Sequence, residues 1–215
     1  MLIIECDTAK LEAQGIVFAH ELAGVTRILA PGAASVLVQA TTQAALLEQL
    51  AAAKAKHATF DVVVLVGHSN IAGLRLFHGP LVTWPAVANW LKTFEPRQVV
   101  LVACEAGRWL PSRTLFSGIP TLDEIYGSPV VTTAAQAAAV KFLVPFLAMG
   151  GALDGDAAQH LLQLGNFLLT GGVIFRQTRE EFARTDVVEG LLWTGLEEVL
   201  RTVLPRIRAS IGSRG

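Results

Sequence analysis

Asp61-Val62-Val63-Val64-Leu65-Val66 runs directly into Gly67-His68-Ser69-Asn70, and Val99-Val100-Leu101-Val102 runs into Ala103-Cys104-Glu105-Ala106-Gly107. These two stretches decide the fold, because continuous β-branched runs are typical of strands in a parallel sheet that is covered on both faces. In open α/β sheets, ligands bind outside the carboxyl ends of the strands. If the two strands are parallel neighbours, a histidine and a cysteine arrive at one edge, which is the arrangement that a cysteine nucleophile requires.

Around these two strands, strand and helix patterns alternate along the chain. The expected strands are Leu2–Cys6, Ser35–Gln39, Asp61–Val66, Val99–Ala103, Pro129–Thr133 and Val173–Arg176. The expected helices are Ala9–Leu22, Gln43–His57, Trp84–Phe94, Ala134–Leu147, Ala157–Thr170 and Val187–Ile207. A small hairpin is expected over Gly73–Val82, and a long connection with one helical turn over Arg108–Tyr126. This order predicts an α/β protein, a three-layer α/β/α sandwich with a mostly parallel central sheet.

Length and composition favour a single domain. The chain has 215 residues and 52% hydrophobic residues, enough for a substantial core. We assign residues 1–140 to the α/β core and residues 141–215 to an apolar helical part of the same domain. Mean hydropathy is high at +0.49. No uninterrupted apolar stretch reaches the ~18–20 residues that span a bilayer, so no membrane span is expected. We interpret the excess apolarity of Val140–Ile207 as a surface for a regulatory protein or for a second copy.

Charge and cysteine content exclude several classes of function. The formal charge is −1, from 17 basic and 18 acidic residues, so nothing indicates nucleic-acid binding. Arg201, Arg206, Arg208 and Arg214 are interpreted as a solvated chain end. Cys6 and Cys104 are the two cysteines, and no leader-like segment precedes the first strand, which together favour a reducing cytoplasm. The compact style of the chain favours a bacterial one. No metal-binding or phosphate-binding motif is present, so no metal or cofactor is expected.

The two quoted stretches resemble caspase-like cysteine peptidases (clan CD), and within them the bacterial CHAT-type branch. That family has a strand ending in His-Gly, a short hairpin, a helix, and a strand ending in an Ala-Cys-x-Ser-Gly type of peptide. The matching residues here are Val66-Gly67-His68, Leu74-Arg75-Leu76 with Leu81-Val82-Thr83, and Leu101 to Gly107. The resemblance covers residues 2 to about 136 and implies a caspase-hemoglobinase fold, with the rest of the chain fitting only loosely.

What the resemblance implies is a His68–Cys104 dyad acting on a protein or peptide substrate. Cys104 would attack a peptide carbonyl and form an acyl-enzyme, and the N–H groups of Cys104 and Ser69 would form the oxyanion hole. CHAT-type proteins often serve as effectors in bacterial conflict or regulated proteolysis and are switched on by a partner. Ser69 stands where the family has glycine, and Ala106 where it has serine. Cys104 follows His68 by 36 positions, fewer than the ~50 of caspases, which suits a compact relative.

Three residues are candidates for substrate binding. Relatives that cleave after basic residues carry an acidic group near the end of the first strand, and Asp7 lies at that position here. Glu105, beside the candidate nucleophile, is a second acidic candidate, and Gln136 after the expected fifth strand is a third. Each has a plainer interpretation: Asp7 as a helix cap, Glu105 as a solvated charge, and Gln136 as part of a helix start.

Two other functions stay open at this point. Gly67-His68-Ser69-Asn70-Ile71 also resembles the nucleophile elbow G-x-S-x-G of serine hydrolases, with Asp123 and His160 in the chain order of a triad. Ile71 in place of the last glycine disfavours that tight turn. The second alternative is a non-catalytic caspase-like scaffold used for binding, which the departures at Ser69 and Ala106 favour.

Overall fold

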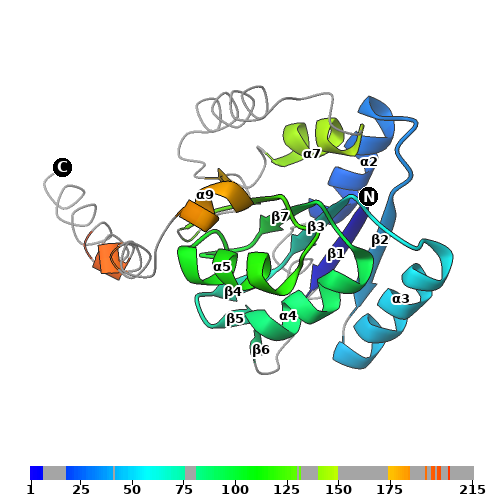
Figure 1. The fold of residues 1–215 in the computed structure, drawn as a ribbon. Helices are drawn as coiled ribbons and strands as arrows, with labels where there is room; N and C mark the ends of the chain where they lie inside the picture. Colours follow the sequence, from blue (N-terminus) through cyan, green and yellow to red (C-terminus); the bar gives the residue numbers. More distant parts are fainter. Residues whose placement is uncertain are drawn as a thin grey trace, which may run out of the picture.

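The computed structural model describes residues 1–6, 18–40, 42–75, 81–129, 131, 140–149 and 174–184, and the single residues 192, 195, 196, 198, 199 and 203. Its centre is a six-stranded sheet in the order β2-β1-β3-β7-β8-β9 (Figure 1). The strands are β1 Leu2–Cys6, β2 Val36–Ala40, β3 Val62–Val66, β7 Gln98–Val102, β8 Glu124–Gly127 and β9 Phe175–Thr178. The first five run parallel to their neighbours, and β9 is antiparallel to β8.

Helices cover both faces of this sheet, which gives the three layers that the sequence predicts (Figure 1). The helices are α2 Phe18–Leu29, α3 Gln43–Lys56, α4 Trp84–Leu91 with the 3₁₀ turn η1 Lys92–Phe94, α5 Trp109–Gly118, α7 Val140–Ala148 and α9 Arg179–Arg184. In α3 the Thr42 hydroxyl accepts a hydrogen bond from the Ala45 N–H at 3.2 Å, as a helix N-cap does. Among the described residues, no helix is long and apolar enough to cross a membrane.

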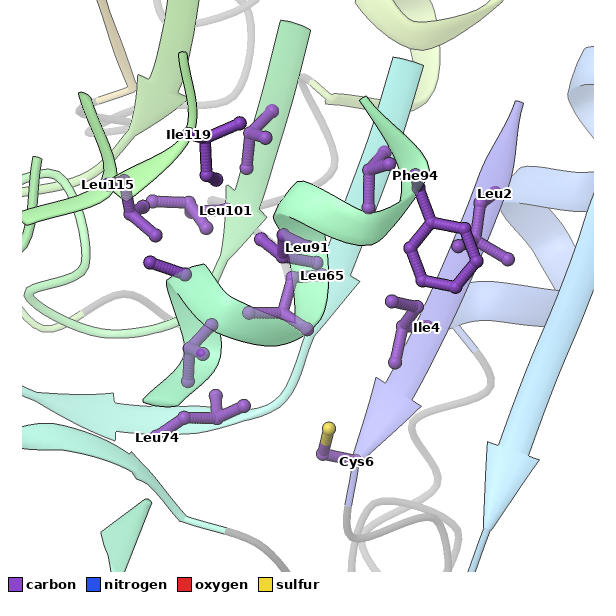
Figure 2. Close-up of a cluster of buried hydrophobic side chains, with 14 of the residues drawn as sticks. Leu2, Ile4, Cys6, Leu65, Leu74, Leu91, Phe94, Leu101, Leu115 and Ile119 are labelled. Carbon is purple, nitrogen blue, oxygen red and sulfur yellow. The ribbon is translucent and has the colours of Figure 1, made fainter. Parts of the chain in front are cut away.

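The central strands of the sheet contribute side chains to two separate cores, because successive side chains point to opposite faces. On one face, Val63 and Leu65 of β3 pack with residues of α3, α4 and α5. Figure 2 shows this cluster, with Leu65, Leu91 and Leu101 between the sheet and the helix that crosses it. On the other face, Val64 and Val66 pack with residues of α2 and α7. Burial on both sides explains why β3 is apolar throughout.

A second, three-stranded antiparallel sheet connects β3 to α4. It consists of β4 His68–Asn70, β5 Gly73–Arg75 and β6 Leu81–Thr83, in that order. The predicted hairpin is confirmed in β5 and β6, whereas β4 was not predicted. Gly73 is required here, because a Cβ at this position would lie 2.2 Å from the Val82 carbonyl oxygen. The Trp84 indole N–H donates to the Asn70 carbonyl at 3.1 Å and fixes the first turn of this sheet against α4.

Two predictions in the middle of the chain were wrong. Residues 108–126, expected as a long connection, contain the helix α5 and most of the strand β8. Pro111 is compatible with α5 because it lies in the first turn, where backbone N–H groups have no partner within the helix. The fifth strand is therefore β8, not the predicted Pro129–Thr133: the chain has left the strand by Ser128, and Val131 is in no strand.

The remaining differences concern element ends. Helix α2 continues to Leu29, beyond the predicted end at Leu22, and the sixth strand is displaced by two residues to β9. Pro145 lies inside α7. The predicted helix Ala157–Thr170 lies outside the described residues, as do residues 9–17 and 134–139. The residues described between 192 and 203 are all helical, in agreement with the helix expected there.

Candidate functional site

The carboxyl ends of β3 and β7 lie side by side. The two strands are parallel neighbours with Val66 opposite Val102, and the Gly67 N–H extends the pairing by donating to the Val102 carbonyl at 3.1 Å. His68 and Cys104 each follow two residues after this last paired position. The sheet therefore delivers the imidazole-bearing and thiol-bearing segments to one edge, as the sequence predicts for neighbouring parallel strands.

A hydrogen bond joins these two segments directly. The Ser69 hydroxyl donates to the Cys104 carbonyl oxygen at 2.5 Å. His68, Ser69 and Cys104 are all half-buried, so this part of the edge is neither sealed in the core nor fully open to water. The residue beside the candidate base is thus in contact with the backbone of the candidate nucleophile.

The position of His68 follows from the tight turn before it. A Cβ on Gly67 would lie 3.3 Å from the Cys6 Cβ, so the absence of a side chain lets the chain pass close to the end of β1. His68 then begins β4, where it pairs with Arg75 across the small sheet. Ser69 pairs with Leu74, one position away from the Asn70–Gly73 pair that closes the turn.

The turn after Cys104 contains an unusual backbone conformation. Glu105 has φ of 59°, in the left-handed region that non-glycine residues seldom adopt. Its side chain is 10% exposed and pairs with Arg108, with 3.7 Å between the Glu105 Oε1 and the Arg108 Nη2. The Arg108 N–H also donates to the Glu105 carbonyl at 3.3 Å. Glu105 is therefore a buried part of the turn. The interpretation of Glu105 as a solvated charge was wrong, because the residue is buried and its carboxylate faces Arg108.

Strands β8 and β9 hold the same turn from the other side. The Gly107 N–H donates to the Ser128 carbonyl at 2.8 Å, and its own carbonyl accepts from the Gln177 amide at 2.8 Å. A Cβ on Gly107 would lie 2.4 Å from the Gly127 carbonyl carbon, so only glycine fits. The Ser112 hydroxyl fixes Gln177 by donating to its side-chain oxygen at 2.5 Å. Ala106 is completely buried.

Arg108 is a central residue of the site that the sequence analysis missed. Its side chain is 1% exposed, and its Nε donates to the Pro129 carbonyl at 3.1 Å. Its Nη1 lies 3.4 Å from a carboxylate oxygen of Glu198, far along the chain. Arg108 therefore connects the Cys104 turn, the loop after β8 and the C-terminal helical residues. The available signal in the sequence was an arginine that follows shortly after the end of an apolar strand.

Glu5 is a second buried charge that sequence reasoning passed over. It lies in β1 opposite Val66 and Gln39 and is 2% exposed. The Gln39 amide donates to one of its carboxylate oxygens and lies 3.2 Å from the Nδ1 of His20, whereas the other oxygen, Oε1, has no hydrogen-bond partner among the described residues. The signal was present in the sequence, since Glu5 is the one charged residue in Leu-Ile-Ile-Glu-Cys.

The other candidate residues do not join this edge. Asp7, Gln136 and His160 lie outside the described residues. Asp123 precedes β8, at the opposite end of the strands from Ser69, and pairs with Arg97 at 2.8 Å. The serine triad of Ser69 with Asp123 is therefore not assembled, and the Ser69 hydroxyl proton is donated to a carbonyl. Within the described parts of the chain, no three His, Cys, Asp or Glu side chains gather as a metal site.

Together, the fold and this edge define an α/β protein whose mostly parallel sheet brings a histidine segment and a cysteine segment into contact. A scan against protein-family models finds no match to the chain, and a search of curated proteins finds none either.

Proposed function

We propose that the chain is a cysteine endopeptidase of the caspase/CHAT-like type, with Cys104 as the nucleophile and His68 as its base. The observation that carries the proposal is the hydrogen bond from the Ser69 hydroxyl to the Cys104 carbonyl, between the ends of two adjacent parallel strands. It holds the segment that bears the imidazole against the segment that bears the thiol. Nucleophile and base close to each other are the minimum that covalent catalysis by cysteine requires.

The proposed reaction uses residues of this edge in turn. His68 accepts the Cys104 proton, and the thiolate attacks the carbonyl carbon of the scissile peptide. The N–H groups of Cys104 and Ser69 donate to the developing oxyanion. The C–N bond breaks as the imidazolium returns its proton to the leaving amine, which leaves a thioester on Cys104. Water, deprotonated by His68, then hydrolyses the thioester.

Two further features support this function. The order of β3, the small sheet β4–β6, α4 and β7 is the order of strand, hairpin, helix and strand in the family that the sequence resembles. The left-handed Glu105 directly follows Cys104. Such conformations cost about 1–3 kcal/mol and cluster at active sites, where the surrounding structure holds them in place. By the same resemblance, we propose a bacterial cytoplasmic effector that a partner activates.

A non-catalytic scaffold of the same architecture is the second candidate. The completely buried Ala106 favours it, since the hydroxyl that the family carries at this position has no counterpart here. In this alternative Cys104 is an ordinary half-buried thiol, and its reactivity does not depend on His68.

Covalent labelling of the thiol separates the two candidates. A peptidyl acyloxymethyl ketone would be incubated with the wild-type chain and with the Cys104→Ala, His68→Ala and Cys6→Ala variants, and adducts located by mass spectrometry. We expect adducts on Cys104, a rate that falls at least ~10²-fold in His68→Ala, and no change in Cys6→Ala, whose thiol is completely buried. Labelling of Cys104 at the same rate without His68 would favour the scaffold.

Cleavage of a peptide library measures the activity itself. We expect Cys104→Ala to lower peptidase activity by at least ~10³-fold, as loss of a nucleophile does. The variant's far-ultraviolet circular dichroism should match that of the wild type, because Cys104 lies in a half-buried turn. Activity that survives Cys104→Ala and disappears in Ser69→Ala would instead assign the nucleophile to Ser69.

A further inference from the structure

A hollow lies on the surface of the protein between helices α5 and α9. Figure 1 shows the two helices next to each other, and the rings of Phe116 in α5 and Phe182 in α9 pack with 4.9 Å between their centroids. The hollow has a volume of about 260 Å³. Its described walls are mainly aromatic rings and guanidinium groups, and no described carboxylate lines it. We call this hollow the α5–α9 pocket.

Each of the two helices contributes an arginine to the α5–α9 pocket. Trp109, Arg113 and Ser117 all line it and follow one another at intervals of four residues, which places them in one row along α5. On α9, Arg179 and Ala183 line it and are again four residues apart. The local sequence of both helices therefore directs one positive charge to the same small space.

Both arginines are held in place, and neither has a carboxylate partner among the described residues. The guanidinium carbon of Arg113 lies 4.9 Å from the centroid of the Trp109 ring. The Nε of Arg179 donates to the Leu122 carbonyl at 2.7 Å, and its Nη2 donates to the Ile119 carbonyl at 2.6 Å. The Nη1 group of Arg179 has no acceptor in the described part of the chain. Guanidinium groups with free N–H donors and a fixed orientation are suited to bind a carboxylate.

The acidic residues of α9 do not neutralise this charge. Glu180 pairs with Arg184 one turn further along the helix. Glu181 accepts a hydrogen bond from the Thr178 N–H at 2.7 Å. Both glutamates line a neighbouring hollow and not the α5–α9 pocket. The positive charge of the pocket therefore remains available to an anion, and the aromatic walls keep part of the water away from it.

We propose that the α5–α9 pocket binds a small aromatic carboxylate. Arg113 and Arg179 donate to the carboxylate, as arginines do in anion sites. The ring of the ligand packs against Phe116 and Phe182, because aromatic rings favour offset or edge contacts with other rings. The volume is slightly below the ~300–1,000 Å³ of pockets for drug-sized ligands, which suits an acid of one or two rings. A nucleotide fits less well, since Ser117 is the one other polar side chain in the described walls that could bind the edge of a base.

The α5–α9 pocket is separate from the candidate active site. His68, Ser69 and Cys104 are not among its described lining residues. Binding of an aromatic acid here therefore does not depend on the proposed peptidase activity. Cys104→Ala should bind the acid as the wild type does, so the two proposals can fail independently.

Titration of the isotope-labelled full chain with 2-naphthoate, followed by NMR, tests the proposal. The indole N–H signal of Trp109, assigned from its absence in Trp109→Phe, reports on the pocket. We expect this signal to shift in a saturable manner with a Kd of about 1 mM or lower, as an acid of this size gives. The uncharged 2-naphthamide should bind at least ~10-fold more weakly, because it loses the charge-assisted hydrogen bonds. Cyclohexanecarboxylate should also bind more weakly, since it has no aromatic ring.

Three variants locate the ligand. Arg113→Gln should raise the Kd of 2-naphthoate at least ~10-fold, because it removes one of the two charges. Arg27→Gln is the matched control: Arg27 is also an exposed helical arginine without a described ion pair, and its Kd should not change. Phe182→Leu should reduce the preference for 2-naphthoate over cyclohexanecarboxylate.

Four results would overturn the proposal. The first is a Trp109 signal that does not shift up to about 10 mM ligand, ten times the expected Kd. The others are equal affinity for 2-naphthoate and its amide, equal weakening by Arg113→Gln and Arg27→Gln, and a preference for the aromatic acid that is unchanged in Phe182→Leu.

Discussion

The two ends of the central strands differ in how their polar groups are used. At the amino end, Arg97 pairs with Asp123 at 2.8 Å, and Glu124 receives hydrogen bonds from Tyr126, Arg176 and Gln98. These groups connect β7, β8 and β9 to one another. At the carboxyl end, the half-buried imidazole and thiol segments meet at a turn with a left-handed glutamate. The polar groups of the amino end therefore join strands to one another, whereas those of the carboxyl end surround the candidate site.

Proton affinities at the amino end agree with a structural role. Burial acts to raise the pKa of Glu124, but the hydrogen bonds from Arg176 and Tyr126 outweigh it, and the pKa lies below its usual value. Burial, followed by the hydrogen bond to Glu124, raises the pKa of Tyr126. Both groups are thus held in one protonation state near neutral pH. Acid–base catalysis requires the reverse, a group whose pKa is close to the working pH.

The largest expected effect comes from filling the space at Gly107, which disrupts the carboxyl end. In Gly107→Ala the new Cβ would lie 2.4 Å from the Gly127 carbonyl carbon. Backbone atoms cannot move aside without separating β7 from β8, so we expect a loss of about 3 kcal/mol or more in the free energy of unfolding. Urea denaturation measures this loss.

Gly24→Ala is the matched control for that experiment. Gly24 lies inside α2, and an added Cβ there would have no atom within 4 Å. Alanine has the higher helix propensity, so the control should gain about 0.5–1 kcal/mol. If Gly107→Ala is as stable as the wild type, the close contact between the Cys104 turn and β8 is incorrect.

The next effect concerns the amino end. Glu124→Gln keeps the shape of the side chain but removes the charge that faces Arg176, whose side chain is only 22% exposed. We expect a loss of about 2 kcal/mol in stability, with thiol labelling of Cys104 unchanged because the variant lies at the other end of the strands. A large fall in labelling would show that the two ends are not independent.

Glu124 also gives this variant a pH signature. Because the pKa of Glu124 is lowered in the folded state, its stabilising contribution is complete above the ordinary value of 4.5 and is lost as the pH falls through the folded-state pKa. The wild type should therefore lose stability more steeply below that pH than Glu124→Gln does. Parallel stability curves in acid would contradict the lowered pKa.

The strands that flank the site could be predicted because strands buried on both faces have continuous apolar runs in the sequence. Strands β1, β3 and β7 were predicted within one residue at each end. The parallel pairing of β3 with β7, the strands that lead to His68 and Cys104, was predicted as well. Strand β8 could not be predicted in this way. Glu124 and Tyr126 interrupt its apolar pattern. Tyr126 donates a hydrogen bond to Glu124, and Arg176 donates another to Glu124 from the neighbouring strand β9, which is distant in sequence.

The missed parts of the site share one physical cause. Arg108 and Glu105 are charged residues, which a sequence taken alone assigns to solvent. The burial of Arg108 depends on a partner distant along the chain, Glu198, and Glu105 is buried beside Arg108, three residues further on. Strand β4 is only three residues long, and His68, Ser69 and Asn70 have no apolar alternation. It forms because β5 pairs with it and Trp84 fixes its turn. Such interactions become visible only in three dimensions.

The smallest expected effect is at the hydrogen bond that joins the two segments of the carboxyl end. Ser69→Ala removes the hydroxyl that donates to the Cys104 carbonyl. One part-buried hydrogen bond contributes about 1 kcal/mol to stability. The backbone N–H of residue 69, the proposed oxyanion donor, is kept. We therefore expect a modest loss of stability and a peptidase activity within ~10-fold of the wild type, since a lost oxyanion donor would cost ~10²–10³-fold.

Ser69→Gly sharpens this test, because glycine is the residue that the resembled family has at this position. It also removes the hydroxyl and keeps the N–H, but it adds backbone freedom that costs about 0.5–1 kcal/mol within a strand. Ser69→Ala and Ser69→Gly should thus have similar activities, with the glycine variant the less stable in urea denaturation. If both variants lose activity ~10³-fold while Cys104 remains labelled, the hydroxyl itself takes part in the chemistry. In that case Ser69 would act through its side chain and not only through its backbone N–H.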